Sequence, residues 1–153
     1  MGAFLDAAGI AKKVDDVMGE TTNIIAMLQD TVNSASNGPV TFSDMIGAYN
    51  ALCHLYVMFS MIAGNASAQS YLGGLMNYTQ TQVQNGVDNF LAKVEAAKSA
   101  LENDLPHYVD SNGQIWWQAV GPDVGNNQQK VYYPTQTETA SSCTAIQAVI
   151  NSL

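Results

Sequence analysis

The chain contains no arginine and few charged residues of any kind. Five lysines and two histidines face 13 carboxylates over 153 residues, the formal net charge is −8, and charged residues make up only 12% of the sequence. Nucleic-acid binding depends on clustered lysine and arginine side chains that neutralise phosphates. Docking on anionic lipid needs a similar basic cluster. We therefore expect no nucleic-acid partner and no electrostatic binding to an acidic membrane surface.

Cysteine is also scarce, and the metal-binding residue types do not cluster in the sequence. Cys53 and Cys143 are the only thiols, and neither belongs to a CxxC pair or a Cys/His cluster. The sequence therefore predicts no zinc site, and we expect no metal ion and no other cofactor. Spacing alone does not decide whether the two cysteines form a disulfide.

The N-terminal residues Met-Gly-Ala-Phe-Leu-Asp lack the basic segment and the long apolar segment of a secretory signal. Asn, Gln, Ser and Thr replace many of the charged residues that usually cover helices, and five lysines leave few sites for a trypsin-like protease. This composition favours a protein that is exported without a classical signal peptide. A cytoplasmic location is the alternative.

What the chain does contain is a set of helical patterns, which predict one domain over residues 1–153. A first helix is predicted over residues 3–35, because apolar residues and one threonine recur at steps of three and four. These are Ile10, Val14, Val17, Thr21, Ile24 and Leu28. Turn-forming residues at 33–39 end this helix. Thr41, three residues before Asp44, then predicts an N-cap for the next helix.

A long second helix is predicted over residues 42–104. No Asp, Glu, Lys or Arg occurs between Met45 and Val87. The 45–63 part is apolar on nearly every face, so it is either buried in protein or placed in a membrane. Polar residues interrupt it before it reaches the roughly 20 residues of a clean span, which favours burial in protein. Glycines predict a break at Gly64 or at Gly73–Gly74.

The same segment supplies the predicted self-association interface. An unbroken helix over 42–104 would be on the order of 90 Å long, so either a bend or a second molecule has to cover its apolar face. Ser60, Gly64 and Ala68 stand four apart, which predicts a ridge of small residues that a second helix can approach closely. The full predicted interface is Met45, Tyr49, Leu52, Tyr56, Phe59, Ser60, Ile62, Ala63, Gly64 and Ala68.

Beyond Pro106 the pattern changes to loops and short strands over residues 106–134. We predict a short hairpin in which the aromatic run at Trp116–Trp117 pairs with the run at Tyr132–Tyr133. These four aromatic side chains form either an exposed interface or a local cluster packed on the helices. A last helix is predicted over 139–153. The expected fold class is thus mainly α, a long helical hairpin or coiled-coil-like stalk with a small aromatic β-hairpin or loop region near the C-terminus.

Signatures of catalysis are missing from the sequence. His54 lies in the uncharged segment and is expected to be a buried histidine hydrogen-bonded to a neighbour, and His107 is expected in a surface loop. No Ser or Cys stands in a known nucleophile signature. The Asp15–Asp16 pair lacks the loop spacing of a calcium site. We therefore expect no enzymatic activity.

The order of segments resembles the EspA-type filament and translocator proteins of type III secretion. The resemblance rests on an apolar helix, Leu52-Cys53-His54-Leu55-Tyr56-Val57-Met58-Phe59, which is followed by a polar segment rich in Gln, Ala and Ser. A coiled-coil-like stretch and Leu105-Pro106…Val109…Asn112-Gly113…Ile115 come next. The similarity covers about residues 50–115. It implies a secreted subunit that polymerises by helical packing, with an export chaperone as a second candidate partner.

Packing and composition together predict a structural subunit of an extracellular helical filament or a similar secreted assembly. Burial of apolar helix faces between copies would hold such an assembly together. The alternative is a secreted translocator or effector whose 45–63 helix inserts into a target membrane.

Overall fold

The structure, a computed structural model, describes residues 7–37, 40–113, 115–117, 120–123, 129–131 and 134–153. It is mainly helical, as predicted. The helices are α1 (Ala7–Asn37), α2 (Phe42–Ala63), α3 (Ala66–Met76), α4 (Gln80–Asp104) and α5 (Ala140–Asn151). Short strands are β1 (His107–Val109), β2 (Ile115–Trp117), β3 (Val120–Asp123) and β4 (Gln129–Val131).

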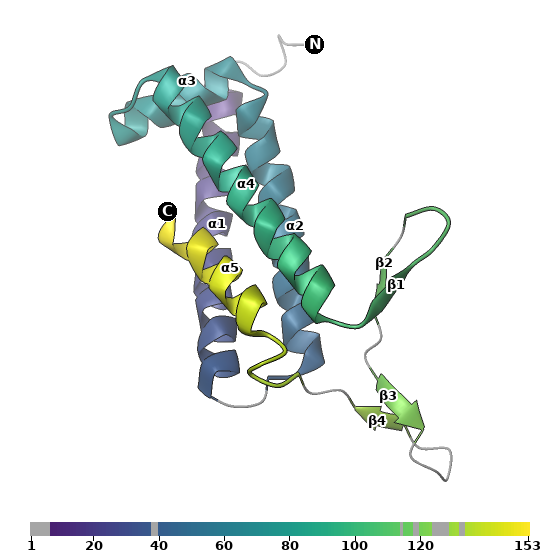
Figure 1. The fold of residues 1–153 in the computed structure, drawn as a ribbon. Coiled ribbons are helices and arrows are strands. Elements are labelled where there is room, and N and C mark those ends of the chain that lie inside the picture. Colours follow the sequence, from purple (N-terminus) through teal and green to yellow (C-terminus); the bar gives the residue numbers. More distant parts are fainter. Residues whose placement is uncertain (1–6, 38–39, 114, 118–119, 124–128, 132–133) are drawn as a thin grey trace.

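The helices form a bundle instead of an extended stalk. The long helices α1, α2 and α4 run lengthwise beside one another, and α5 packs against both α1 and α4 (Figure 1). The short α3 crosses one end of the bundle, where it contacts α1, α2 and α4. Helix α2 begins where the sequence predicts. The Thr41 hydroxyl accepts a hydrogen bond from the Asp44 backbone N–H at 3.0 Å, which confirms the predicted N-cap.

The predicted 42–104 helix is divided first at Gly64. The backbone N–H of Gly64 donates to the Ser60 carbonyl at 3.1 Å as α2 ends. Asn65 then caps α3, because its side-chain oxygen accepts from the Ala68 N–H at 2.9 Å. One residue thus ends one helix and the next begins another, and the chain folds back on itself.

The second division lies at Asn77, not at Gly73–Gly74. Asn77 adopts the left-handed conformation (φ 60°, ψ 41°), which asparagine tolerates better than most residues. Gly73 stays inside α3, but the returning chain passes so close that a Cβ at Gly73 would lie 2.5 Å from the Tyr78 carbonyl oxygen. Thr79 and Gln82 then form a reciprocal capping box that starts α4.

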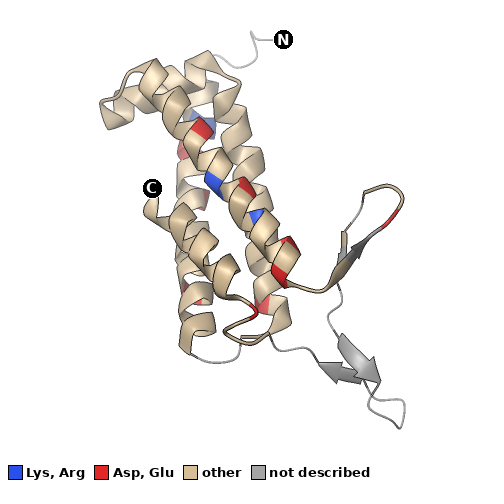
Figure 2. Ribbon diagram, in the orientation of Figure 1, with Lys and Arg blue, Asp and Glu red and all other residues tan. Residues whose placement is uncertain are grey.

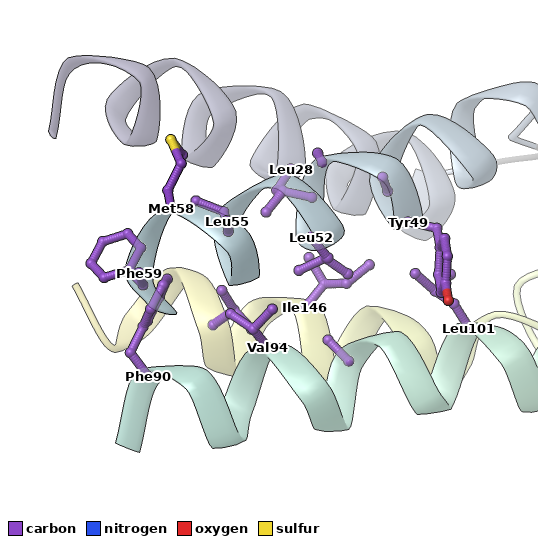
Figure 3. Packing of buried hydrophobic residues seen from close by; sticks show 14 of the residues in the cluster. Leu28, Tyr49, Leu52, Leu55, Met58, Phe59, Phe90, Val94, Leu101 and Ile146 are labelled. Carbon is purple, nitrogen blue, oxygen red and sulfur yellow. The ribbon is translucent and has the colours of Figure 1, made fainter. Parts of the chain in front are cut away.

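The core lies where α2 faces α1, α4 and α5. Figure 3 shows the buried side chains between the helices: Leu28 of α1, Leu52 and Leu55 of α2, Val94 and Leu101 of α4, and Ile146 of α5. All six are fully buried. Phe59 and Phe90 pack with ring centroids 4.5 Å apart nearer the α3 end. Burial of side chains of this size contributes roughly 1.5–3 kcal/mol each before conformational entropy is subtracted.

The predicted pairing of the two aromatic runs is not supported. β2 pairs in antiparallel fashion with β1, with Val109 opposite Ile115, and β4 pairs with β3. The turn at residues 110–113 explains this, because Gly113 takes a positive φ of 79° and its N–H donates to the Asp110 carbonyl at 3.0 Å. That turn brings β1 and β2 together across a short loop, which costs less entropy than closure of a long one. Tyr132 and Tyr133 lie outside the described residues.

Candidate functional site

Most of the predicted self-association residues lie inside the folded chain. Met45, Tyr49, Leu52, Phe59, Ile62 and Ala68 are buried, Tyr56, Ser60 and Ala63 are half-buried, and Gly64 is exposed. Their partners are the chain's own α1, α4 and α5, as the contact between Phe59 and Phe90 illustrates. In this bundle, the apolar face of α2 is therefore already covered.

The predicted ridge of small residues does not form on one helix. Ser60 is in α2, Gly64 is its C-cap and Ala68 is in α3, because the chain bends between them. The Ser60 hydroxyl donates to the Tyr56 carbonyl at 2.7 Å within its own helix. No second helix can therefore use the three residues as one continuous groove.

Trp117 packs on the bundle and forms a local aromatic cluster. Its ring centroid lies 5.0 Å from that of Tyr49 and 6.4 Å from that of Phe42, both in edge-to-face geometry. The His107 ring lies tilted against the same indole, with centroids 5.5 Å apart, and its Nδ1 contacts the Leu105 carbonyl oxygen at 3.0 Å. His107 is thus half-buried at the start of β1 and is not a surface-loop residue. The side chain of Trp116 lies outside the described part of the chain.

His54 is on the outer face of α2 and is not buried, which corrects the prediction. Its Nε2 lies 2.7 Å from Glu20 Oε2 of α1, and both side chains are more than half exposed. The helical period explains the outward position, since Asn50 and Val57 stand four before and three after it and are exposed too. An exposed pair of this kind contributes little to stability.

The two thiols are free and poorly suited to nucleophilic chemistry. Cys53 in α2 and Cys143 in α5 are half-buried and unbonded. Burial raises the pKa of both thiols above the ordinary value, and the thiolate is the reactive form. Among the described residues, no group of three or more His, Cys, Asp or Glu side chains could hold a metal ion.

A hollow of about 590 Å³ opens where α3, the adjoining part of α4 and the C-terminal end of α5 face α1. α1 contributes Met18, Thr21 and Ile25 to its wall, and α4 contributes Val83, Val87 and Phe90. None of the described residues that line it carries an Asp, Glu, Lys, Arg or His side chain. The wall is therefore apolar with a few uncharged polar groups.

Thr21 differs from the other threonines of α1. Its side chain is only 3% exposed, and its Oγ1 has no hydrogen-bond partner among the described residues. The hydroxyls of Thr22 and Thr31 donate to carbonyls four residues earlier, at 3.0 and 3.1 Å. A buried hydroxyl that lacks a partner costs about 1–3 kcal/mol.

The mouth of this hollow adjoins exposed apolar side chains. Leu75, Met76 and Tyr78 at the α3–α4 turn are 58%, 50% and 52% exposed, and Leu153 is 56% exposed. Met76, Tyr78 and Leu153 also line the hollow. Figure 2 shows that α3 and the turn after it carry no charged residue. We call Leu75, Met76 and Tyr78 the turn patch.

Two features of the sequence point to this region, although periodicity alone does not single them out. Thr21 stood on the apolar stripe of the first helix, but its missing hydrogen bond depends on a rotamer and on neighbours far along the chain. Leu75 and Met76 follow the Gly73–Gly74 pair within an uncharged segment.

No protein-family model matches the chain, and no curated protein and no solved structure matches it either.

Proposed function

We propose that this protein is a non-enzymatic structural subunit that associates with copies of itself through the turn patch. The observation that carries the proposal is the exposure of Leu75, Met76 and Tyr78 close together in a segment that has no charged residue. The predicted interface on α2 is covered by the chain itself, so the turn patch replaces it as the contact surface. A secreted assembly of the EspA type, exported without a classical signal, is the setting that the sequence favours.

Charge supports this choice of contact. Each copy has a formal net charge of −8, so two copies repel each other wherever their carboxylates approach. The stretch from Met45 to Val87 has no Asp, Glu, Lys or Arg, and it includes the turn patch. Copies that meet through the turn patch itself bury apolar area from a segment that contributes no carboxylate to the contact. Each large side chain that becomes fully buried contributes roughly 1.5–3 kcal/mol.

The experiment compares molar mass against concentration for three chains, by size-exclusion chromatography with light scattering. The wild type is expected to gain mass with concentration, up to the dimer that one self-complementary patch can form. Leu75→Gln with Met76→Gln removes the apolar contact and is expected to stay monomeric, since glutamine keeps the helix propensity of α3. Val57→Gln is the matched control, because Val57 is 69% exposed on α2 away from the turn patch. A wild type that stays monomeric throughout, or a control that loses association equally, contradicts the proposal.

A second candidate function is membrane insertion of α2. Among the described helices, α2 alone is long and apolar enough to cross a membrane. The core helix of a soluble bundle can be just as long and apolar as a membrane-spanning helix. In this fold α2 has ten buried residues. Insertion therefore requires the bundle to open. Release of dye from neutral-lipid vesicles tests it, and intact vesicles at every pH would count against it.

A further inference from the structure

We propose that Met76 is an oxidation site, at which conversion of the thioether to the sulfoxide abolishes self-association through the turn patch. The inference rests on the proposed function, since it names how that contact is regulated. Met76 is the last residue of α3 and one of the three residues of the turn patch. A change of polarity at this one sulfur atom therefore alters the contact surface itself.

The described methionines differ in how far solvent reaches them. Met76 is 50% exposed and Met27 is 37% exposed, whereas Met45 is fully buried. Met18 and Met61 are half-buried. A peroxide has to reach the sulfur atom, so the rate of oxidation follows exposure. Met76 is therefore expected to react first among the methionines that the structure describes.

Met27, the next most exposed methionine, has a sulfur atom that already contacts a hydrogen-bond donor. The Thr31 hydroxyl lies 3.7 Å from this sulfur and 3.1 Å from the Met27 carbonyl oxygen. The lone pair that makes a thioether a weak hydrogen-bond acceptor is also the pair that attacks a peroxide. Donation from Thr31 therefore makes the Met27 sulfur less nucleophilic, which adds to the advantage that exposure gives Met76.

Oxidation changes the polarity of the turn patch without changing its charge. The sulfur lone pair attacks one oxygen of hydrogen peroxide, the O–O bond breaks, and the products are the sulfoxide and water. Sulfur is oxidised by two electrons and the peroxide is reduced. Burial of the new S–O group is costly unless it is hydrogen-bonded, and of the patch side chains only Tyr78 carries a donor. The net charge stays −8, so added repulsion does not contribute to the loss of association.

The two cysteines are poor competitors for the peroxide. Cys53 and Cys143 are half-buried. Burial raises the pKa of both thiols, so the reactive thiolate is scarce at neutral pH. Methionine sulfoxide reductases return the sulfoxide to the thioether. Oxidation at Met76 is thus both selective and reversible, as a regulatory modification requires.

The first experiment measures where oxidation occurs. The full chain is treated with hydrogen peroxide at a concentration where light scattering gives the monomer mass, and peptide mass spectrometry follows the sulfoxide at each methionine. Met76 is expected to oxidise several-fold faster than Met27 and more than about tenfold faster than Met45, which reacts only when the bundle opens. Equal rates at Met76 and Met27, or a fast Met45, would overturn the assignment. Met1 lies outside the described residues and is scored separately.

The second experiment measures whether the sulfoxide controls association. The oxidised wild type is expected to have a dissociation constant at least about tenfold higher, and methionine sulfoxide reductases are expected to restore the original value. Met76→Leu keeps an apolar side chain of similar size and both thiols, so it should associate with or without peroxide. Met27→Leu is the matched control and should remain sensitive to peroxide. Equal sensitivity of Met76→Leu and the wild type contradicts the inference.

The inference and the proposed function fail separately. An untreated wild type that is monomeric at every concentration contradicts self-association and its regulation, whereas the oxidation rates still decide whether Met76 is the modification site. An untreated chain that associates, and stays associated after Met76 is oxidised, contradicts the regulation alone.

Discussion

The side-chain amide of Gln69 in α3 donates to the backbone carbonyl of Ile62 in α2 at 3.0 Å. The same nitrogen lies 3.0 Å from the Ala63 carbonyl oxygen, and it also bonds to the Gln84 side chain of α4. Gln69 is only 3% exposed. The Ile62 carbonyl also accepts from the Asn65 N–H at 3.2 Å, so the buried amide adds a second donor there and ties three helices together.

Replacement of Gln69 by leucine is expected to destabilise the fold by about 1–3 kcal/mol, because the bonds of its amide to the Ile62 and Ala63 carbonyls and to Gln84 are lost. The free energy of unfolding in urea measures this. Gln80→Ala is the control: Gln80 is exposed and donates to Gln69 Oε1 at a longer 3.2 Å, so a loss within about 0.5 kcal/mol is expected there. Equal losses for both variants would show that the amide has no special role.

The adjacent glycines Gly73 and Gly74 are expected to respond in opposite directions to alanine. A methyl group on Gly73 would lie 2.5 Å from the Tyr78 carbonyl oxygen, whereas Gly74 has nothing within 4 Å. Gly73→Ala should destabilise the protein by about 1–3 kcal/mol as the backbone shifts. Gly74→Ala should stabilise it by up to about 1 kcal/mol, since alanine favours the helix. Thermal unfolding of both variants checks the sign, and a stabilised Gly73→Ala would refute the close approach.

The Asp104 carboxylate at the end of α4 accepts hydrogen bonds from the first turn of α5. Its carboxylate accepts from the Ser142 N–H and from the Ser141 hydroxyl, both at 2.9 Å, and from the Ser142 hydroxyl at 2.5 Å. Thr139, the N-cap of α5, makes no side-chain cap hydrogen bond in the described chain, so Asp104 supplies the acceptor and the negative charge that a helix N-terminus favours.

Asp104→Ala is therefore expected to cost about 1–3 kcal/mol and to speed amide hydrogen exchange in α5 more than in α2. Asp30→Ala, at an exposed position of α1, serves as the control and should leave exchange in α5 unchanged. Uniform acceleration across all helices in Asp104→Ala would mean that the carboxylate supports the whole fold and not α5 in particular.

Tyr49 makes stability fall at alkaline pH. Its hydroxyl donates to Glu102 Oε1 at 2.6 Å. Burial, and then the hydrogen bond and the charge of Glu102, raise the pKa of Tyr49 well above the ordinary tyrosine value of 10.0. The unfolded chain releases this proton from about pH 10, while the folded chain holds it. The stability that Tyr49 contributes is therefore present below about pH 10 and declines as the pH rises above it.

Tyr49→Phe removes this proton, so the variant should lose less stability than the wild type between about pH 9 and pH 11. Urea unfolding at each pH gives the comparison. Absorbance of tyrosinate should also show one late-titrating group fewer in the variant. Parallel pH profiles for the two proteins would rule out Tyr49 as the source.

The helices and the side that each one buries were largely predictable from the sequence, because apolar residues at steps of three and four mark a covered face. What covers the face was not predictable. Leu52 and Phe59 show the same pattern whether they pack on α4 of their own chain or on another copy. The choice depends on the turns at Gly64 and Asn77, and the left-handed conformation at Asn77 (φ 60°) has no strong signal in the sequence.

The candidate site was less predictable than the fold. Thr21 belongs to the apolar stripe that the sequence predicts for the first helix. Whether its hydroxyl finds a hydrogen-bond partner depends on how α1, α3 and α4 pack, which the stripe does not reveal. His54 sits among apolar neighbours in sequence and still points outward beside Glu20, because only the helical phase relative to the core decides its exposure. Leu75 and Met76 are exposed because α3 is short and ends at the turn, which depends on the same left-handed residue.

Sedimentation velocity over a range of protein and salt concentrations tests the central claim most directly. Copies with a net charge of −8 repel each other, and salt screens that repulsion while leaving apolar contacts intact. The account predicts that the average mass of the wild type rises with protein concentration and rises further with salt, and that Leu75→Gln with Met76→Gln abolishes both effects. A wild-type chain that sediments as a monomer under all these conditions, or one whose association weakens as salt is added, would contradict self-association through the turn patch.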